Sequence, residues 1–338
     1  MIDYHVTVTE KSLESYKVVQ AGDFIISLRS FQGGIEYSQY HGICSPAYVI
    51  LRRRTGGSDA YFKHYLKTDR FIRSLTRNLE GLRDGKMISY KQFSELLLPV
   101  PSPPEQQKIA ECLSSLDGLI TAEGRKLAAL RDHKRGLMQH LFPQSGEAQP
   151  RLRFPAFRDK GEWVEKVLSD TCLMQAGKFV AASDIREQDE DGLYPCYGGN
   201  GLRGFTKSRT HDGVYPLIGR QGALCGNVRL ARGEFHATEH AIVATPKKGV
   251  HVIWLYYMLD WLNLNRFATG QAQPGLSVDA LEKVTLTVPA LEHEQGRIAA
   301  CLSALDARIA AQAAKIETLK QHKRGLMQQL FPAPEGQE

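Results

Sequence analysis

The hydrophobic residues of the chain form two long stripes with heptad spacing. Leucine and isoleucine recur at intervals of mostly four and three residues, and the same series returns 189 positions later. This spacing predicts two long helices with a coiled-coil seam. The stripes consist of Ile109, Leu113, Leu116, Ile120, Leu127, Leu130, Leu137 and Leu141, and of Ile298, Leu302, Leu305, Ile309, Ile316, Leu319, Leu326 and Leu330.

The two stripes belong to one segment that occurs twice. By count, about 23 of the 40 aligned positions in residues 104–143 and 293–332 are identical. The first copy opens at Ser102-Pro103-Pro104-Glu105, which is typical of a helix start. Both copies end at Leu-Phe-Pro, because proline cannot continue a helix. Each copy predicts a rod of about 60 Å, the length of a spacer, although ordinary core helices are the alternative explanation.

Segments of mixed character precede each helix. Residues 162–289 contain strand-like runs at Tyr215–Ile218 and Ala241–Ala244, many glycines and an apolar helical stretch at 253–262. Residues 1–101 look like a shorter relative. We therefore predict an α+β fold in which two globular α/β domains alternate with two long helices as a pseudo-twofold internal repeat. The expected order is 1–101 for a partial first domain, 102–143 for the first helix, 144–161 for a linker, 162–289 for the second domain, 290–332 for the second helix and 333–338 for a tail.

Composition narrows the classes of protein. The net charge of +6 and a pI near 8.9 favour an anionic partner. No apolar run approaches the roughly 20 residues that span a bilayer, and the polar start at Met1–His5 lacks a signal-peptide core, so we predict a cytoplasmic protein with no membrane partner. The six cysteines form no CxxC pair, which argues against a zinc knuckle or a disulfide framework.

Two literal motifs do not have the sequence context that their chemistry needs. Gly199–Gly204 matches a dinucleotide fingerprint, but no apolar helix follows it. His236–His240 matches a zinc-peptidase pattern, but it adjoins a strand-like run instead of forming a helix. The chain also contains neither an Asn/Asp-Pro-Pro-Tyr run nor a Walker A sequence. We therefore expect no catalytic residue, no metal and no cofactor in this chain.

The chain resembles the specificity subunits of type I restriction-modification systems. The resemblance covers nearly all of the chain. It rests on the Leu-Pro-Val-Pro-x-x-x-Glu-Gln start of the first helix, the His-Lys-Arg-Gly-Leu-Met-Gln-x-Leu-Phe-Pro ends, Pro150–Pro155 ahead of Trp163, and Tyr194–Gly201. The chain departs from the family at its start, since residues 1–22 align with roughly 192–213. The counterpart of Trp163–Asp191 is therefore missing from the first domain.

The resemblance implies two target recognition domains, each of which reads one half of a bipartite site in double-stranded DNA. Two antiparallel helices would hold the domains apart and bind two adenine-methyltransferase subunits, and restriction and translocase subunits would join them. S-adenosylmethionine, ATP and Mg would then belong to the partner subunits. The alternative is a coiled-coil scaffold or decoy that occupies the methyltransferase subunits without complete DNA recognition. An autonomous nuclease or methyltransferase is disfavoured by the missing motifs.

Several polar residues are candidates for DNA contact. Asn200 suits adenine, Arg203 suits guanine, and Lys207 and Arg209 suit phosphates. Solvated loops with structural glycines are the alternative explanation. Further candidates are Arg220 and Gln221 after a strand, Arg29, Ser30 and Gln32 at the matching place in the first domain, and the cations Arg52, Arg53, Arg54, Lys63, Lys67, Arg70, Arg73 and Arg77 as a phosphate-facing surface.

Polar residues interrupt both heptad stripes at matching places. They are Glu123 and Lys134 in the first helix and Gln312 and Lys323 in the second. If the helices are antiparallel, one register sets Glu123 beside Lys323 and Lys134 beside Gln312 at once. We predict this register, because polar seam residues specify alignment at some cost in stability. A wet edge or a partner contact is the alternative explanation of these positions.

Overall fold

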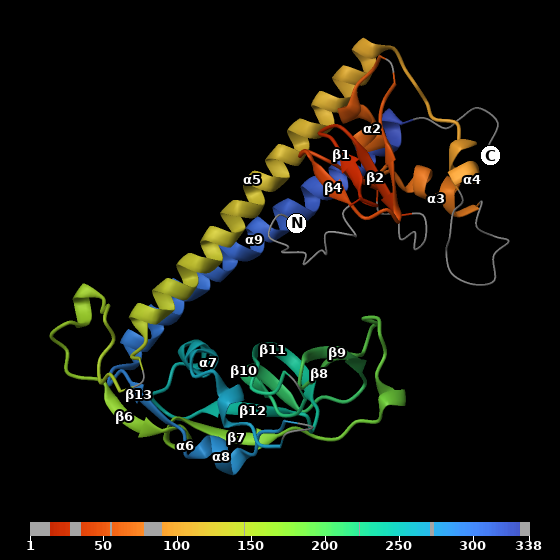
Figure 1. Ribbon diagram of the computed structural model, residues 1–338. Coiled ribbons are helices and arrows are strands. Elements are labelled where there is room, and N and C mark those ends of the chain that lie inside the picture. The colour runs from red at the N-terminus through yellow and green to blue at the C-terminus, as the bar shows by residue number, and fades with distance from the viewer. Residues whose placement is uncertain are drawn as a thin grey trace. The chain divides into compact units, whose positions relative to one another are not determined.

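The protein was analysed as a computed structural model, which describes residues 14–27, 35–54, 56–77, 90–144, 146–222, 224–270 and 274–331. The candidates Arg29, Ser30 and Gln32 lie outside these ranges. The chain divides into two compact units, one made of Met1–Leu127 with Gln312–Glu338 and the other of Ala128–Ala311. They are called unit 1 and unit 2 below. The expected α+β class is confirmed, because both units combine helices with sheets (Figure 1).

Unit 1 contains a small sheet and short helices that pack against parts of two long helices. The sheet has the order β3-β2-β5, with antiparallel pairing throughout, and a separate pair joins β1 to β4. Its core joins Ile26 of the sheet to Tyr61, Leu113 and Phe331. The elements are β1 Lys17–Val19, β2 Phe24–Ser27, β3 Ile35–Tyr37, β4 Gly42–Cys44, β5 Tyr48–Leu51, α2 Asp59–Tyr65, α3 Asp69–Arg77, α4 Tyr90–Ser94, and the unit 1 parts of α5 Pro103–Leu141 and α9 Glu292–Leu330.

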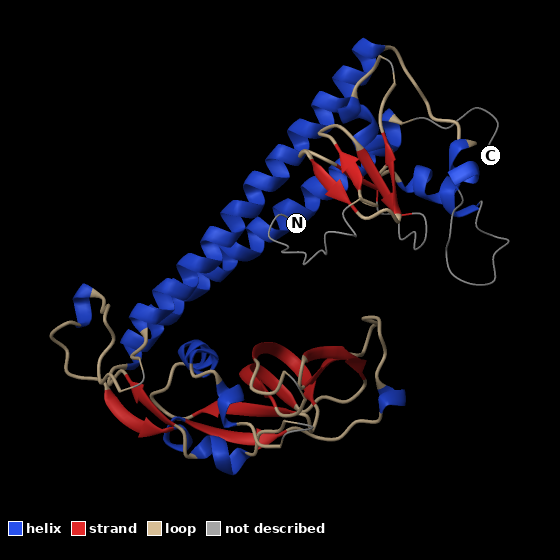
Figure 2. Cartoon of the chain, in the orientation of Figure 1, coloured by secondary structure: helices blue, strands red, loops and turns tan. Residues whose placement is uncertain are grey.

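Unit 2 is built on a six-stranded sheet of the order β7-β12-β10-β11-β8-β9. Helix α7 packs against β10 and β11 (Figure 2), and its fully buried Trp254 is part of the core of unit 2. A second, two-stranded sheet joins β13 to β6. The elements are η1 Pro155–Phe157, β6 Val164–Val167, α6 Leu168–Thr171, β7 Cys172–Ala176, η2 Ala182–Asp184, β8 Tyr194–Gly198, β9 Gly201–Thr206, β10 His211–Gly219, β11 Val228–Ala237, β12 Ala241–Pro246, α7 Val252–Trp261, η3 Leu264–Phe267, α8 Val278–Glu282 and β13 Thr285–Val288.

The two predicted long helices are present as α5 and α9. All eight apolar seam residues of each helix are buried or half-buried, so the stripe read from the sequence is the packed face. Within unit 1 the two helices run antiparallel, since the residues of α5 contact α9 in reversed order. Among the described residues, no helix is long and apolar enough to cross a membrane.

The two units share a local plan. In unit 1 the middle strand β2 pairs antiparallel with β3 and β5, and in unit 2 β10 pairs in the same way with β11 and β12. A helix with a side-chain N-cap follows in each unit. Ser58 caps α2 and His251 caps α7. Residues predicted to be similar from sequence therefore occupy similar elements.

A glutamine at the start of each long helix joins that helix to its unit. Gln106 accepts a hydrogen bond from the Ser58 amide at 2.9 Å and donates one to the Pro101 carbonyl at 2.8 Å. Gln295, 189 positions later, accepts from the His251 amide at 2.8 Å and donates to the Pro289 carbonyl at 3.2 Å. Both glutamines are about 1% exposed. Breaking either contact would leave a buried amide without a partner, which is costly.

Candidate nucleic-acid interface

Three loops meet at one end of the unit 2 sheet. They are the turn between β8 and β9, the segment after β10, and the turn between β11 and β12. The Arg220 amide donates to the His240 carbonyl at 2.9 Å. A methyl group added to Gly219 would lie 2.1 Å from the carbonyl oxygen of Gly199, so the loops touch through their backbones. This close packing requires glycine at position 219.

The loops bring several of the predicted contact residues together. Asn200 lies exposed in the β8–β9 turn, Gln221 is exposed, and Arg220 is half-exposed between them and the sheet. Arg203 is exposed on β9, and its side chain lies against the end of β8, since a methyl group on Gly198 would lie 2.7 Å from its Cδ atom. These four residues therefore present two side-chain amides and two guanidinium groups at this end of the sheet. We call Asn200, Arg203, Arg220 and Gln221 the loop cluster.

Lys207 and Arg209 lie at the far end of β9 from the turn. The six residues of β9 span about 20 Å, which separates these two cations from Asn200. Arg209 forms an ion pair with Glu234 and lies over the Tyr194 ring, with 5.9 Å from the guanidinium carbon to the ring centroid. Lys207 is exposed. Lys207 and Arg209 were grouped with Asn200 because they are close in sequence. The extended strand β9 separates them from Asn200 in space.

The zinc-like run His236–His240 ends β11 and enters a turn, as its strand-like neighbours predicted. His236 is 3% exposed, and its ring nitrogens lie 2.9 Å from Ser208 Oγ and 3.0 Å from the Lys178 carbonyl. These contacts tie the end of β11 to neighbouring segments. Within the described ranges, no three His, Cys, Asp or Glu side chains gather in a metal-binding group.

Sequence reasoning missed two residues beside the loop cluster. His240 supplies the carbonyl that receives the Arg220 amide, and Glu239 Oε1 lies 3.2 Å from His240 Nε2. The other carboxylate oxygen of Glu239 is buried and has no hydrogen-bond partner among the described residues. A carboxylate of this kind can accept a hydrogen bond from an amino group. The place of Glu239 and His240 between two predicted strands was the only sign in the sequence that they could lie near the loop cluster.

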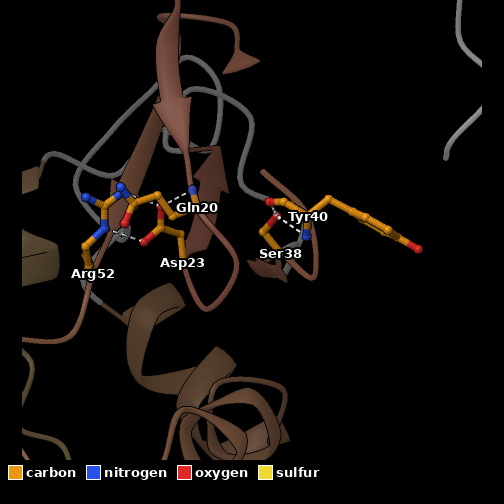
Figure 3. A network of polar contacts seen from close by, with 5 residues as sticks. All are labelled: Gln20, Asp23, Ser38, Tyr40 and Arg52. Atoms are coloured by element: carbon orange, nitrogen blue, oxygen red, sulfur yellow. Dashed lines mark hydrogen bonds and ion pairs between the residues drawn. The ribbon is translucent and has the colours of Figure 1, made fainter. Parts of the chain in front are cut away.

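The cations of unit 1 are partly neutralised by nearby carboxylates. Arg52 donates to both carboxylate oxygens of Asp23 at 2.7 Å, and the Gln20 amide donates to the same group (Figure 3). The hydrogen bond from Arg52 lowers the pKa of Asp23, which is 1% exposed. Arg53 pairs with Asp59 at 2.6 Å. These two arginines therefore stabilise the fold, which weakens their assignment to a phosphate-facing surface.

Other cations of unit 1 gather around one cavity of about 380 Å³. Lys67, Arg70 and Arg73 come from α3 and the turn before it, and Arg324 comes from the last turns of α9. Arg70 donates to the Phe331 carbonyl at 3.3 Å, and Lys67 lies 3.5 Å from Glu36. Asp69 also lines the cavity, and its carboxylate offsets part of the charge of these four cations. Of the eight cations that were predicted to face phosphates, Lys67, Arg70 and Arg73 lie together at this cavity.

The predicted helix register is wrong. Glu123 bonds Gln312 at 2.6 Å and also pairs with Lys315, so it does not reach Lys323. Lys323 pairs with Asp117 at 2.5 Å. In unit 2, Lys134 pairs with Asp306 at 2.7 Å and not with Gln312. The prediction failed because it paired only the residues that interrupt the apolar stripe, whereas the aspartates that hold the lysines lie beside the stripe.

In each unit, one cluster of polar side chains joins a short helix to the two long helices. In unit 2 the Tyr257 hydroxyl donates to Asp306 at 2.7 Å and lies 3.3 Å from the Ser303 hydroxyl, and Asp306 also accepts from Lys134. In unit 1 the corresponding aspartate is Asp117, which pairs with Lys323. We call these two groups the helix anchors. Their Ser, Asp and Lys members are separated by 189 positions in the sequence.

The unit 1 anchor has a histidine where unit 2 has Tyr257. His64 Nε2 lies 3.0 Å from Ser114 Oγ, and its Nδ1 lies 3.8 Å from Asp117. Burial, followed by the positive charge of Lys323, lowers the pKa of His64 to about 4. His64 is therefore neutral at pH 7. Burial likewise raises the pKa of Tyr257, which stays protonated at pH 7 and keeps its donor proton.

Solved structures share this fold. A crystal structure of a type I restriction-modification S subunit from M. genitalium aligns with a TM-score of 0.64 and 18% identity, over 94% of this chain and 85% of that one. A structure from work on complex assembly and conformational transition of the type I R-M system aligns with a TM-score of 0.60 and 19% identity, over 94% and 83% of the two chains. At this identity the likeness concerns the fold alone.

Sequence comparison assigns the family. The type I restriction enzyme EcoprrI specificity subunit of Escherichia coli is 38% identical over 222 residues, which are 63% of this chain and 53% of that protein. The MjaVIII specificity subunit of Methanocaldococcus jannaschii is 25% identical over 185 residues, 54% of this chain and 42% of that protein. The chain thus spans about half the length of these relatives. The family model described as the type I restriction modification DNA specificity domain matches residues 8–131 and 160–321, and the chain belongs to this family.

Proposed function

We propose that this chain is a non-catalytic subunit that recognises a bipartite sequence in double-stranded DNA. It directs two adenine-methyltransferase subunits, and the restriction subunits that join them, to that site. Membership of the specificity family supports this function. S-adenosylmethionine, ATP and Mg would be bound by the partner subunits. This chain would select the sequence, and its partners would carry out the chemistry.

The loop cluster of unit 2 is the observation that carries the proposal. Three loops that touch through their backbones hold Asn200, Arg220 and Gln221 at one end of the sheet. Amides pair with adenine and guanidinium groups with guanine, each through two hydrogen bonds in the major groove. A base contact needs side chains held in fixed positions, and the packed loops supply them. Arg203, which lies against the end of β8, adds a second guanidinium group.

Cations outside the loop cluster would hold the DNA backbone. Lys207 and Arg209 follow β9, and Lys67, Arg70, Arg73 and Arg324 line the cavity of unit 1. Phosphate contacts position a protein on DNA without reading its sequence. This division assigns specificity to the loop cluster and general affinity to the other cations.

The long helices would set the distance between the two half-sites and hold the methyltransferase subunits. Each helix has 39 residues, which gives a length of about 58 Å. The helix anchors and the buried glutamines support this role, because they fix each unit on its parts of α5 and α9. A fixed attachment is what a spacer between two recognition domains requires.

Exchange of one recognition domain tests the proposal directly. Residues 162–289 would be replaced by the corresponding domain of another family member, and the variant would be expressed with its methyltransferase subunits. Methylome sequencing is expected to show a new sequence in one half of the methylated site and no change in the other half. If both halves stay unchanged, unit 2 does not read DNA. The unaltered chain with the same subunits is the control.

A further inference from the structure

Three exposed apolar side chains belong to segments that adjoin the loop cluster. Phe179 is 75% exposed, Leu202 is 55% exposed and Leu224 is 50% exposed, and no other large apolar side chain among the described residues of unit 2 is as exposed as these. Leu202 follows the turn between β8 and β9, and Leu224 lies in the segment after β10. Exposed apolar groups that are rimmed by polar residues are typical of an interaction surface.

The backbone that leads to Phe179 is fixed on the turn between β11 and β12. The Lys178 amide donates to the Ala237 carbonyl at 2.8 Å, and the Gly177 amide donates to the Ala241 carbonyl at 2.9 Å. A methyl group on Gly177 would lie 2.2 Å from the Ala237 carbonyl oxygen, so this approach requires glycine. The chain next to Phe179 is therefore held in place, while the aromatic ring itself faces solvent.

The same turn holds part of the loop cluster. Its His240 carbonyl accepts a hydrogen bond from the Arg220 amide at 2.9 Å. Its Thr238 amide donates to the Tyr197 carbonyl of β8 at 2.8 Å, close to the turn that carries Asn200. Phe179 and the loop cluster are therefore attached to one turn, the loops by these hydrogen bonds and the ring through the residues that precede it.

The charges on these segments favour an anionic ligand. Lys178, the neighbour of Phe179, is exposed, and Arg203 and Arg220 belong to the loop cluster. Glu239 supplies a carboxylate on the turn. These cations outnumber the carboxylate, so the residues together carry a net positive charge, which suits the phosphates of DNA. The major groove of DNA also displays one apolar group, the 5-methyl group of thymine, which an aromatic side chain can contact.

We propose that Phe179 is a specificity-determining residue that contacts the 5-methyl group of a thymine in the half-site read by unit 2. This inference rests on the proposed function and adds a base to it, since side-chain amides suit adenine and guanidinium groups suit guanine, whereas thymine is distinguished by its methyl group. Lys178 holds a neighbouring phosphate while the ring of Phe179 meets the edge of the base. Contact withdraws both the methyl group and the exposed ring from water, which stabilises the complex.

Replacement of single thymines by uracil tests the proposal, because uracil lacks only the 5-methyl group. The full chain is purified with its methyltransferase subunits, and fluorescence anisotropy measures its affinity for duplexes that carry the sequence found by methylome sequencing. At one thymine in the half-site of unit 2, the replacement should weaken wild-type binding about fourfold, as expected for the loss of one methyl group from an apolar contact. For Phe179→Ala the thymine and uracil duplexes should bind equally, because the ring that contacts the methyl group is absent.

Leu173→Ala provides the matched control, since Leu173 is 49% exposed on β7, where it pairs with Thr245 of β12. It should keep the wild-type sensitivity to uracil. A half-site of unit 2 without thymine, a wild-type complex that no uracil weakens, or a uracil effect that Phe179→Ala retains would each overturn the proposal. Failure of the proposed function gives a different result, because the wild-type complex would then bind the methylated sequence no more tightly than unrelated DNA.

Discussion

The ammonium group of Lys134 lies 2.7 Å from a carboxylate oxygen of Asp306, and the other oxygen of that carboxylate accepts a hydrogen bond from the Tyr257 hydroxyl at 2.7 Å. One carboxylate thus connects α5, α9 and α7 within unit 2. The side chain of Lys134 is 18% exposed and that of Asp306 is 36% exposed, so water screens the pair only in part. Contacts of this kind contribute more than a fully exposed ion pair.

Loss of the Asp306 charge is expected to destabilise unit 2. Asp306→Asn should lower the free energy of unfolding by about 1–3 kcal/mol, because two charge-assisted hydrogen bonds weaken together. Tryptophan fluorescence during urea unfolding measures the effect, since all tryptophans lie in unit 2. Asp132→Asn is the control, because Asp132 is exposed and, among the residues that the structure describes, pairs only with Arg135. Equal stability of the two variants would mean that the anchor contributes little.

The stability of unit 1 is expected to fall in mild acid because of His64. The folded state holds the pKa of His64 at about 4, below the value of 6.5 from which it is lowered. The unfolded chain therefore binds more protons between these values. The stabilising contribution is complete above pH 6.5 and is lost as the pH falls toward 4, by roughly 3 kcal/mol at most.

His64→Gln should flatten this dependence, which hydrogen exchange of the α2 amides can follow at several pH values. His133→Gln is the matched control, because His133 is exposed on α5. A wild-type profile that is already flat between pH 4 and 6.5 would contradict the assignment. Helix α7 should show no equivalent step from its anchor, since Tyr257 stays protonated throughout this range.

Single substitution at the contact between Glu123 and Gln312 is expected to cost more stability than joint substitution. Gln312 is 7% exposed and donates to both the carboxylate and the backbone carbonyl of Glu123. Gln312→Leu should lower the melting temperature, because it leaves the carboxylate beside an apolar side chain. The double variant Glu123→Leu with Gln312→Leu should recover stability, since both polar groups are removed together. Additive losses in the two single variants would refute this coupling.

Arg220 is expected to read one base pair. Arg220→Ala should cost about 1–3 kcal/mol in DNA affinity and should relax a single position of the methylated sequence, as loss of a bidentate base contact does. Methylome sequencing with the partner subunits present distinguishes this result from a uniform loss. A uniform loss across sequences would mark a phosphate contact. Lys207→Ala is the comparison, because it should weaken binding without changing the sequence read.

Release of Arg209 from its carboxylate partner is expected to strengthen general DNA binding. Glu234 pairs with Arg209 and offsets its charge. Glu234→Gln should therefore raise affinity for unrelated DNA and steepen the dependence of log affinity on log salt concentration by up to about 1. Binding measured over a series of salt concentrations tests this. An unchanged slope would show that Arg209 does not approach the DNA backbone.

The sequence predicted the elements with periodic patterns better than the contacts between them. The heptad stripes located α5 and α9, and the apolar runs located β10, β12 and α7. Each of these depends on local spacing, which the sequence displays directly. The helix pairing was wrong because Asp117 and Asp306 lie beside the stripe. The sequence pattern alone could not show that they reach the lysines of the opposite helix.

The candidate site was predicted in part. Asn200, Arg203, Arg220 and Gln221 come together although up to 21 positions separate them. Lys207 is closer to Asn200 in sequence and yet lies outside the cluster, because a strand extends about 3.3 Å per residue. Glu239 was missed, since its place depends on the pairing of β11 with β10 and β8. Such pairing between distant segments has no local signature.

The contacts of Gln295 bear on how such proteins can acquire new specificities. Gln295 bonds only main-chain atoms of its unit, namely the His251 amide and the carbonyls of Gly249 and Pro289. Every amino acid supplies a carbonyl and nearly all supply an amide, so this joint places little demand on the sequence of the domain that it holds. Under the proposed function, mutation or recombination could therefore change the bases read without rebuilding the attachment. The joint thus constrains Gln295 itself and leaves the sequence of the domain that it holds free to vary.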